Sequence, residues 1–248
     1  EEILHIPTCA SSSHGLLSLN NQALVASQAH KHGSLGGGAI FTWPLNKPQV
    51  PIRSYPIEAI GPICCTRDGI YLAGGSPSGN AYIWEVSSGR LLKSWRANHK
   101  SLSCVIFSSD DSLFIAGSDD GTICSWSMVS LLDVTDTRIL PPIFHVSWDH
   151  SSTITGLLSP SSSASSSLMS SSLDGTCKVW DPASGRLLRT RAYPLAITTI
   201  VLDPGEQLLF AGSADGRIFA DMLDLGLNED PFVVAVEQST SRVLNGHK

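Results

Sequence analysis

Two stretches of the chain each supply a histidine, a serine and an aspartate, the side chains that serine hydrolases use for nucleophilic catalysis. The two sets are His99, Ser118 and Asp120, and His150, Ser172 and Asp174. A tryptophan follows each aspartate, at Trp126 and Trp180. When buried, these groups can instead satisfy one another, because an indole N–H and a carboxylate both need hydrogen-bond partners. We therefore expect the two sets to be structural and the protein not to be an enzyme.

The other candidates for chemistry are weaker. His30 and His32 have metal-compatible spacing, but no cysteine or carboxylate stands nearby, so a solvated loop is the simpler interpretation. Residues 33–38 are glycine-rich, but they open no helix, and no phosphate-loop motif occurs. No C-x-x-C pair occurs among the six cysteines, which are Cys9, Cys64, Cys65, Cys104, Cys124 and Cys177. We predict buried reduced thiols, no metal site and no cofactor.

The composition limits the classes of partner. The chain has 248 residues, of which 42% are hydrophobic and 15% are charged. A charged fraction below the roughly 25% of average globular proteins indicates that partners cover part of the surface. The net charge of −6 opposes broad binding to nucleic acid. No apolar run reaches the roughly 18 residues of a membrane span, and no signal peptide is visible at the start.

Two local features could meet partners. Arginines gather at the expected outer strands of two repeats, at Arg90, Arg96, Arg186, Arg189 and Arg191. They could contact RNA phosphate or an acidic protein, or they could form an ordinary solvated edge. Residues 159–167 are a low-complexity, serine-rich segment that could be phosphorylated or could serve as an unmodified linker.

A repeating element must position these side chains. In four places a glycine opens a β-rich hexad that ends in tryptophan, at Trp43, Trp84, Trp126 and Trp180. A fifth copy, residues 216–221, keeps the glycine and ends in Asp221. The copies lie about 40 residues apart, with one longer interval, and this is the period of a β-propeller blade.

Each repeat predicts four short strands, so the expected fold class is an all-β propeller of four-stranded antiparallel blades. The third copy is the clearest, because the apolar run 113–117 precedes a hairpin turn at Gly121. The predicted blades span residues 15–55, 60–96, 102–148, 153–191 and 196–244, of which the last is degenerate. Insertions are expected at 129–142 and 224–240, with a helical turn over 129–133.

This periodicity resembles the WD40 family, whose repeats carry Gly-His near the start and Trp-Asp at the end. Trp180 precedes Asp181 in the one literal Trp-Asp, and the Gly-His position is occupied by Asn98-His99, Asp149-His150 and Gly246-His247. The family's structural network joins the histidine to a turn aspartate, a strand serine or threonine and the tryptophan. The resemblance assigns one network to His99, Asp120, Ser118 and Trp126, and another to His150, Asp174, Ser172 and Trp180.

Longer runs resemble one group within this family, the WD40 subunit of the pre-60S ribosome maturation complex (rixosome), whose plant members are also known as root-initiation regulators. The runs are residues 61–65, 83–92, 126–132, 172–180 and the degenerate 216–224. The resemblance implies a non-catalytic, nucleolar and nucleoplasmic scaffold that supports removal of internal transcribed spacer 2. Its implied partners are the other subunits of that complex, the AAA ATPase midasin and pre-60S particles, with RNA contact secondary and no membrane.

An interaction protein of another class stays open as the alternative, either a chromatin-complex subunit or a substrate receptor of a ubiquitin ligase. The resemblance also implies about seven blades, of which five are visible. Residues 1–6 are expected to be the outer strand of a closing blade, and residues 245–248 the start of another. We therefore expect a longer ring, since an open arc would expose strand edges.

Overall fold

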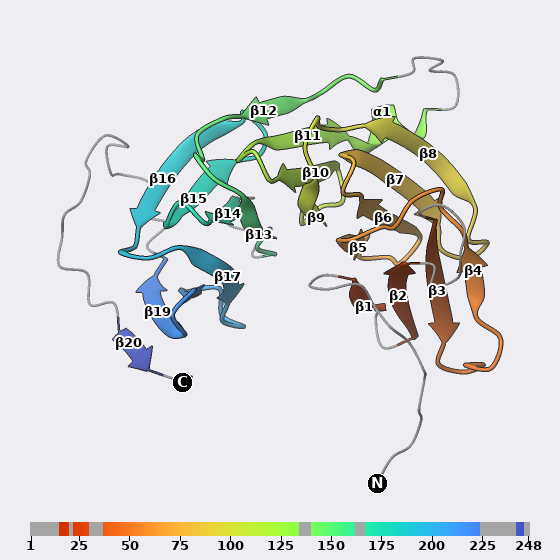
Figure 1. Cartoon of the computed structure of the whole chain (residues 1–248), viewed down its shortest axis with the longest axis horizontal. Helices are drawn as coiled ribbons and strands as arrows, with labels where there is room; N and C mark the ends of the chain where they lie inside the picture. The colour runs from red at the N-terminus through yellow and green to blue at the C-terminus, as the bar shows by residue number, and fades with distance from the viewer. Residues whose placement is uncertain are drawn as a thin grey trace, which may run out of the picture.

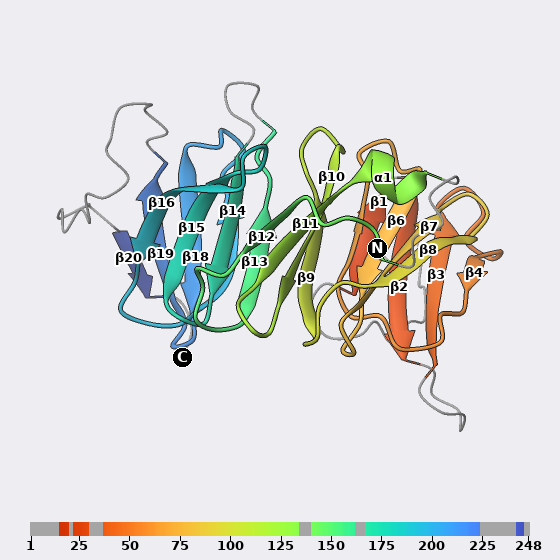
Figure 2. The same ribbon diagram turned by 90° about the horizontal axis from the view of Figure 1, so that it is seen from above.

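Five four-stranded antiparallel sheets make up the fold, and we number them blade 1 to blade 5 in chain order. The computed structural model describes residues 15–19, 22–29, 37–133, 140–161, 167–223 and 242–245. Figure 1 shows the sheets side by side around an open arc, and Figure 2 shows the same arc from above. The predicted fold class, an all-β propeller of four-stranded blades, is confirmed.

Within each blade the strands follow one another from the inner to the outer edge of the arc. Blade 1 has β1 (Leu16–Leu19), β2 (Ala23–Ala29), β3 (Gly38–Pro44) and β4 (Ile52–Ser54). Blade 2 has β5 (Ile63–Cys65), β6 (Tyr71–Gly75), β7 (Asn80–Glu85) and β8 (Leu91–Arg96). Blade 3 has β9 (Leu102–Phe107), β10 (Leu113–Ser118), β11 (Ile123–Ser127) and β12 (His145–Ser147).

The remaining two blades repeat this order. Blade 4 has β13 (Ile154–Leu158), β14 (Leu168–Ser172), β15 (Thr176–Asp181) and β16 (Arg186–Ala192). Blade 5 has β17 (Ile197–Leu202), β18 (Leu208–Ser213), β19 (Arg217–Met222) and β20 (Arg242–Asn245). Asp221 therefore stands in the third strand of blade 5, where the other blades place tryptophan.

The hydrophobic core is divided into layers between successive blades. One layer joins Ala73 and Ile83 of blade 2 to Phe114 and Trp126 of blade 3. Three similar layers lie between blades 1 and 2, 3 and 4, and 4 and 5. Every residue of β10 and β14 is buried, as expected for strands covered on both faces. The sheets thus stabilise one another face to face.

The repeated glycines are needed for two different reasons, both of which concern the backbone. Gly121 adopts φ +83° in the turn between β10 and β11, and a Cβ there would lie 2.5 Å from the carbonyl oxygen of His150. Gly38 is the first residue of β3, and a Cβ there would lie 2.4 Å from the carbonyl oxygen of Glu58. Glycine is therefore required for a left-handed turn in the first case, and for close approach of the next blade in the second.

The longer interval between blades 3 and 4 contains α1 (Met128–Leu132), which confirms the predicted helical turn. Met128 and Leu131 are buried against Trp95 of β8, so the helix covers the outer strand of the preceding blade. No helix in the described ranges is long and apolar enough to cross a membrane.

Several sequence predictions fall outside the described residues. They are the outer strand at residues 1–6, Cys9, the His30/His32 pair, most of the glycine-rich turn, the centre of the serine-rich segment, the 224–240 insertion and the Gly246-His247 pair. Of the other cysteines, Cys104, Cys124 and Cys177 are buried as predicted, whereas Cys64 and Cys65 are only half-buried; all five described thiols are free. Burial raises the pKa of the Cys65 and Cys124 thiols to about 11, which leaves them protonated and unreactive at neutral pH.

Candidate functional site

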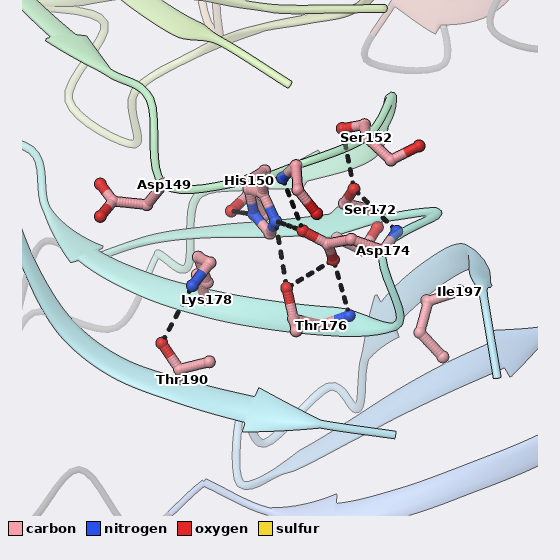
Figure 3. Close-up of polar contacts among 12 residues, drawn as sticks. Asp149, His150, Ser152, Ser172, Asp174, Thr176, Lys178, Thr190 and Ile197 are labelled. Carbon is pink, nitrogen blue, oxygen red and sulfur yellow. Dashed lines mark hydrogen bonds and ion pairs between the residues drawn. The ribbon is translucent and has the colours of Figure 1, made fainter. Parts of the chain in front are cut away.

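One buried polar network links the start of blade 4 to its central strands (Figure 3). His150 precedes β13, and its Nδ1 lies 3.0 Å from Oδ2 of Asp174 in the β14–β15 turn. Its Nε2 lies 2.8 Å from Oγ of Ser170, which also accepts the indole N–H of Trp180 at 2.8 Å. Thr176 donates to Asp174 Oδ1 at 2.6 Å. We call these five residues the histidine network.

The contacts fix where the protons reside. Because the Asp174 carboxylate can only accept, the proton of His150 lies on Nδ1. The bare Nε2 accepts the hydroxyl proton of Ser170, whose oxygen in turn accepts Trp180 N–H. His150 is then neutral, with its proton on Nδ1 facing Asp174. Burial lowers the pKa of His150 more than Asp174 raises it, in agreement with the neutral ring.

The aspartate of the network stays ionised. Burial on its own would raise the pKa of Asp174, but donors lower it below its ordinary value. These donors are the Thr176 hydroxyl, the backbone N–H of Ser151 and His150. The carboxylate therefore anchors the turn at neutral pH.

The order Ser–His–Asp is that of a hydrolase, but the surroundings prevent catalysis. Ser170 and His150 are both buried. The indole N–H of Trp180 binds the Ser170 oxygen, the atom that would have to attack a substrate carbonyl. The network therefore fastens the turn to the sheet.

The serine of the network is Ser170, and the prediction of Ser172 was wrong in this respect. Ser172 Oγ instead donates to the carbonyl of Ser152 at 2.9 Å and accepts the backbone N–H of Asp174 at 3.1 Å. Ser170 is two residues earlier on the same strand, and Leu168 pairs with Trp180. This register brings Ser170, rather than Ser172, within reach of the indole.

Blade 3 lacks the predicted network. Asn98, not His99, occupies the inward position and donates to Asp120 Oδ1 at 3.4 Å and to the Thr122 hydroxyl. His99 is exposed. Ser118 Oγ donates to the carbonyl of Ser101 at 2.9 Å, as Ser172 does in blade 4.

As a result, the indole of blade 3 has no partner for its N–H. Ala116 stands where blade 4 has Ser170, two residues after the partner of the tryptophan in the strand pairing. Trp126 Nε1 is buried without a hydrogen bond. Its ring packs edge-on against Trp95, with centroids 5.6 Å apart. Trp126 is thus held in the core by packing alone, without a hydrogen bond from its indole N–H.

Blades 1 and 2 keep their tryptophans in the core. Trp43 stacks on Phe41 with ring centroids 5.4 Å apart, and Trp84 stacks on Tyr82 at 5.5 Å. In blade 2 the residue at the histidine position is Glu58, which accepts from Asn80 Nδ2 at 2.7 Å and from the hydroxyls of Ser78 and Tyr82.

Blade 5 replaces the tryptophan with a buried ion pair. Asp221 Oδ2 accepts the hydroxyl of Tyr193 at 2.5 Å and lies 3.8 Å from Nε of Arg191. Burial, together with Cys177 and Asp221, raises the pKa of Tyr193, so the phenol remains a donor. Both partners come from the end of blade 4 or the segment leading into blade 5, so a polar contact joins the two blades here.

The remaining binding candidates from the sequence are dispersed. Arg90, Arg96 and Arg186 are exposed, whereas Arg189 and Arg191 are half-buried. No group of metal-ligating side chains occurs in the part of the chain that the structure describes.

An apolar surface on the outer edge of blade 3 was not predicted. Phe144, Val146 and Trp148 are exposed, Trp148 to 73%, while His145 and Ser147 between them turn inward. We call Phe144, Val146 and Trp148 the apolar strip. Polar residues inward and apolar residues outward reverse the pattern of a solvent-facing strand. Such a surface is typical of a binding site.

The strand that carries the strip is held rigidly. His145 Nε2 lies 2.8 Å from the carbonyl oxygen of Ala183 in the β15–β16 turn of blade 4. Phe144 N–H donates to Ser125 O at 2.8 Å. A shallow depression of about 30 Å³ lies between β12 and that turn, lined by Val146, Trp180 and other residues. The apolar strip therefore borders a hollow between two fixed elements.

Removing the Ser170 hydroxyl should destabilise the fold. Ser170→Ala leaves both Trp180 N–H and His150 Nε2 buried without partners, each costing about 1–3 kcal/mol. We expect the free energy of unfolding, measured with denaturant, to fall by about 2–4 kcal/mol. The reciprocal change Ala116→Ser supplies an acceptor to Trp126 and should stabilise by about 1 kcal/mol. A neutral Ser170→Ala variant would contradict the network.

The neutral, buried His150 should make stability depend on pH. Its folded pKa lies below its ordinary value of 6.5, so the unfolded chain takes up a proton first as the pH falls. The free energy of unfolding should therefore be highest above about pH 7 and decrease as the pH falls below 6.5. His150→Gln should flatten this slope, whereas the exposed control His99→Gln should preserve it. Equal slopes in both variants would refute this assignment.

Comparison with known proteins agrees with the geometry. The family model described as "WD domain, G-beta repeat" matches residues 89–127 and 143–181. A chain in the solved structure described as "Crystal Structure of Mitotic Checkpoint Complex" superposes with a TM-score of 0.65 at 16% identity. The superposition covers 81% of this chain and 57% of that one, and it supports the fold alone.

Curated relatives extend over most of the chain. It is 36% identical to Protein ROOT INITIATION DEFECTIVE 3 of Arabidopsis thaliana, over 88% of this chain and 50% of that protein. It is 33% identical to human WD repeat-containing protein 18, over 94% and 52%. It is 31% identical to the pre-rRNA-processing protein crb3/ipi3 of Schizosaccharomyces pombe, over 70% and 42%. The chain spans about half the length of the first two relatives and 42% of the third. It belongs to the WD40-repeat family.

Proposed function

We propose that this protein is a non-catalytic scaffold in ribosome biogenesis. Two observations support the proposal. The chain is similar to proteins named for pre-rRNA processing in Schizosaccharomyces pombe and Meyerozyma guilliermondii. Its Ser–His–Asp cluster is sealed within the blade, which leaves surfaces rather than a catalytic centre to act. The finer role that we propose is nuclear, in pre-60S maturation and removal of internal transcribed spacer 2.

Among the structural observations, the apolar strip carries the scaffold role furthest. Large apolar side chains on the outer strand of a blade lose contact with water only when another protein covers them. Rigid aromatic side chains such as Trp148 are typical anchors of protein interfaces. The partners that we propose are the other subunits of the pre-60S maturation complex, with midasin and the particle itself reached through that assembly.

Replacing Val146 and Trp148 of the apolar strip should abolish binding to the proposed partners and leave the fold intact. In the Val146→Ser/Trp148→Ser double variant of the full-length protein, we expect stability within about 0.5 kcal/mol of the original, because both side chains are exposed. Co-purification of pre-60S proteins from nuclear extract should fall at least tenfold. In depleted cells, the variant should fail to clear RNA that retains spacer 2.

The control is Leu91→Ser, which alters an exposed apolar residue on β8 of blade 2. This variant should still co-purify with pre-60S proteins and should still clear RNA that retains spacer 2. If the double variant also does both, the strip is not the interface. Recovery of cullin adaptors or histones without ribosomal precursors would instead favour a ubiquitin-ligase or chromatin role.

We further propose that the five blades belong to a longer ring. Thr199 of the inner strand β17 is exposed, whereas its counterparts Cys104 in blade 3 and Gly156 in blade 4 are buried, so one face of the blade 5 sheet has room for a neighbour. The relatives are about twice as long as this chain, and that length is sufficient for further blades.

Single-particle images of the full-length protein should therefore show a closed ring of about seven sectors. An arc of five sectors with the rest of the chain folded as a separate body would refute this architecture. Hydrogen exchange offers an independent readout, because β17 and β19 should exchange slowly only when a further blade covers them.

A further inference from the structure

Hydrogen bonds join the turns between the first and second strands of successive blades. The backbone N–H of Arg67 in blade 2 donates to Asp111 Oδ2 in blade 3 at 3.0 Å. The backbone N–H of Ser109 in blade 3 donates to Ser159 Oγ in blade 4 at 2.8 Å. These turns of blades 2, 3 and 4 are therefore connected in series along one rim of the arc.

The connection between blades 4 and 5 has two hydrogen bonds to a single oxygen atom. Ser161, which follows β13 in blade 4, donates its backbone N–H to Glu206 Oε1 at 2.6 Å. Its hydroxyl donates to the same oxygen at 2.9 Å. Glu206 belongs to the β17–β18 turn of blade 5, so one carboxylate oxygen accepts two hydrogen bonds across the boundary between the blades.

The backbone at Glu206 gives independent evidence that this contact matters. Glu206 has φ +54°, and Asp111 in the corresponding turn of blade 3 has φ +57°. Blade 2 places Gly69 there, at φ +72°. A left-handed conformation is unfavourable for residues other than glycine. Both acidic residues accept it where their carboxylates reach the backbone of the preceding blade.

We propose that Ser161 is a phosphorylation site, and that its phosphorylation separates the rim of blade 5 from blade 4. Ser161 is exposed at the start of a serine-rich segment, so a protein kinase can reach its hydroxyl. The Ser161 oxygen forms a bond to the γ-phosphorus of ATP, the bond to the ADP oxygen breaks, and the hydroxyl proton passes to a base of the kinase. The products are phosphoserine and ADP.

The modification reverses the character of the contact. The hydroxyl proton that binds Glu206 is lost, and three acceptor oxygens with a charge of about −1.5 to −2 take its place. A carboxylate cannot donate to them, and like charges at this range repel. The turn of blade 5 is therefore displaced from Ser161.

The fold itself survives this change. Thr155 Oγ1 still donates to the Ile197 carbonyl at 2.9 Å near the inner edge, and the Tyr193–Asp221 contact persists in the body of the blades. Release is confined to the rim. This inference goes beyond the scaffold role, because it concerns control of the boundary between two blades rather than the surface that binds partners.

The test uses full-length protein with phosphoserine inserted genetically at position 161. Hydrogen exchange of the 203–208 turn should accelerate at least threefold over the unmodified protein. Phosphoserine at Ser88 is the matched control, because that hydroxyl also donates to a glutamate, Glu85, but within one blade. It should leave the 203–208 turn unchanged. In Glu206→Gln, the effect of phosphoserine at position 161 should shrink, since an amide oxygen accepts without charge.

Occupancy is tested on protein recovered from growing cells in the presence of phosphatase inhibitors. Mass spectrometry of the peptide that contains Ser161 should locate phosphate on that residue. The proposal is overturned if Ser161 carries no phosphate while neighbouring peptides are observed. It is equally overturned if phosphoserine at position 161 leaves exchange of the 203–208 turn unchanged, or acts as strongly in Glu206→Gln.

Discussion

The packing of successive sheets face to face is the constraint on which this structure depends. Strands such as β10 and β14 are buried on both faces, so a single blade would expose most of its apolar surface. The core clusters accordingly lie between blades, and each blade contributes to two layers unless it ends the arc. Polar atoms caught between the sheets must then find partners there, because water is excluded.

That requirement is met differently in each blade. The segment leading into the blade supplies His150 in blade 4, Asn98 in blade 3 and Glu58 in blade 2, and each reaches the turn after the second strand. Blade 5 instead buries Asp221 against Tyr193 and Arg191. In blades 2 to 4 the geometry therefore preserves the position of the link, while its chemistry varies with the donors and acceptors that the neighbouring strands offer.

The sequence predicts the fold because glycine and tryptophan recur where backbone and packing demand them. It does not distinguish Ser170 from Ser172, since every residue of β14 is buried and only the pairing of Leu168 with Trp180 selects one. Likewise, a one-residue offset decides that Asn98 faces inward and His99 outward. The apolar strip was missed because apolar residues on a short strand are expected to face the core.

The same packing explains why the binding surface that we propose lies on an outer strand. Neighbouring blades cover both faces of the middle sheets, so the outer strands and the turns are the parts that a partner can reach. On β12 the contact between His145 and the carbonyl of Ala183 orders the strand before any partner arrives. A partner that covers Trp148 then loses little free energy in ordering this side of the interface. The rigidity that stabilises the arc thus also favours binding at its edge.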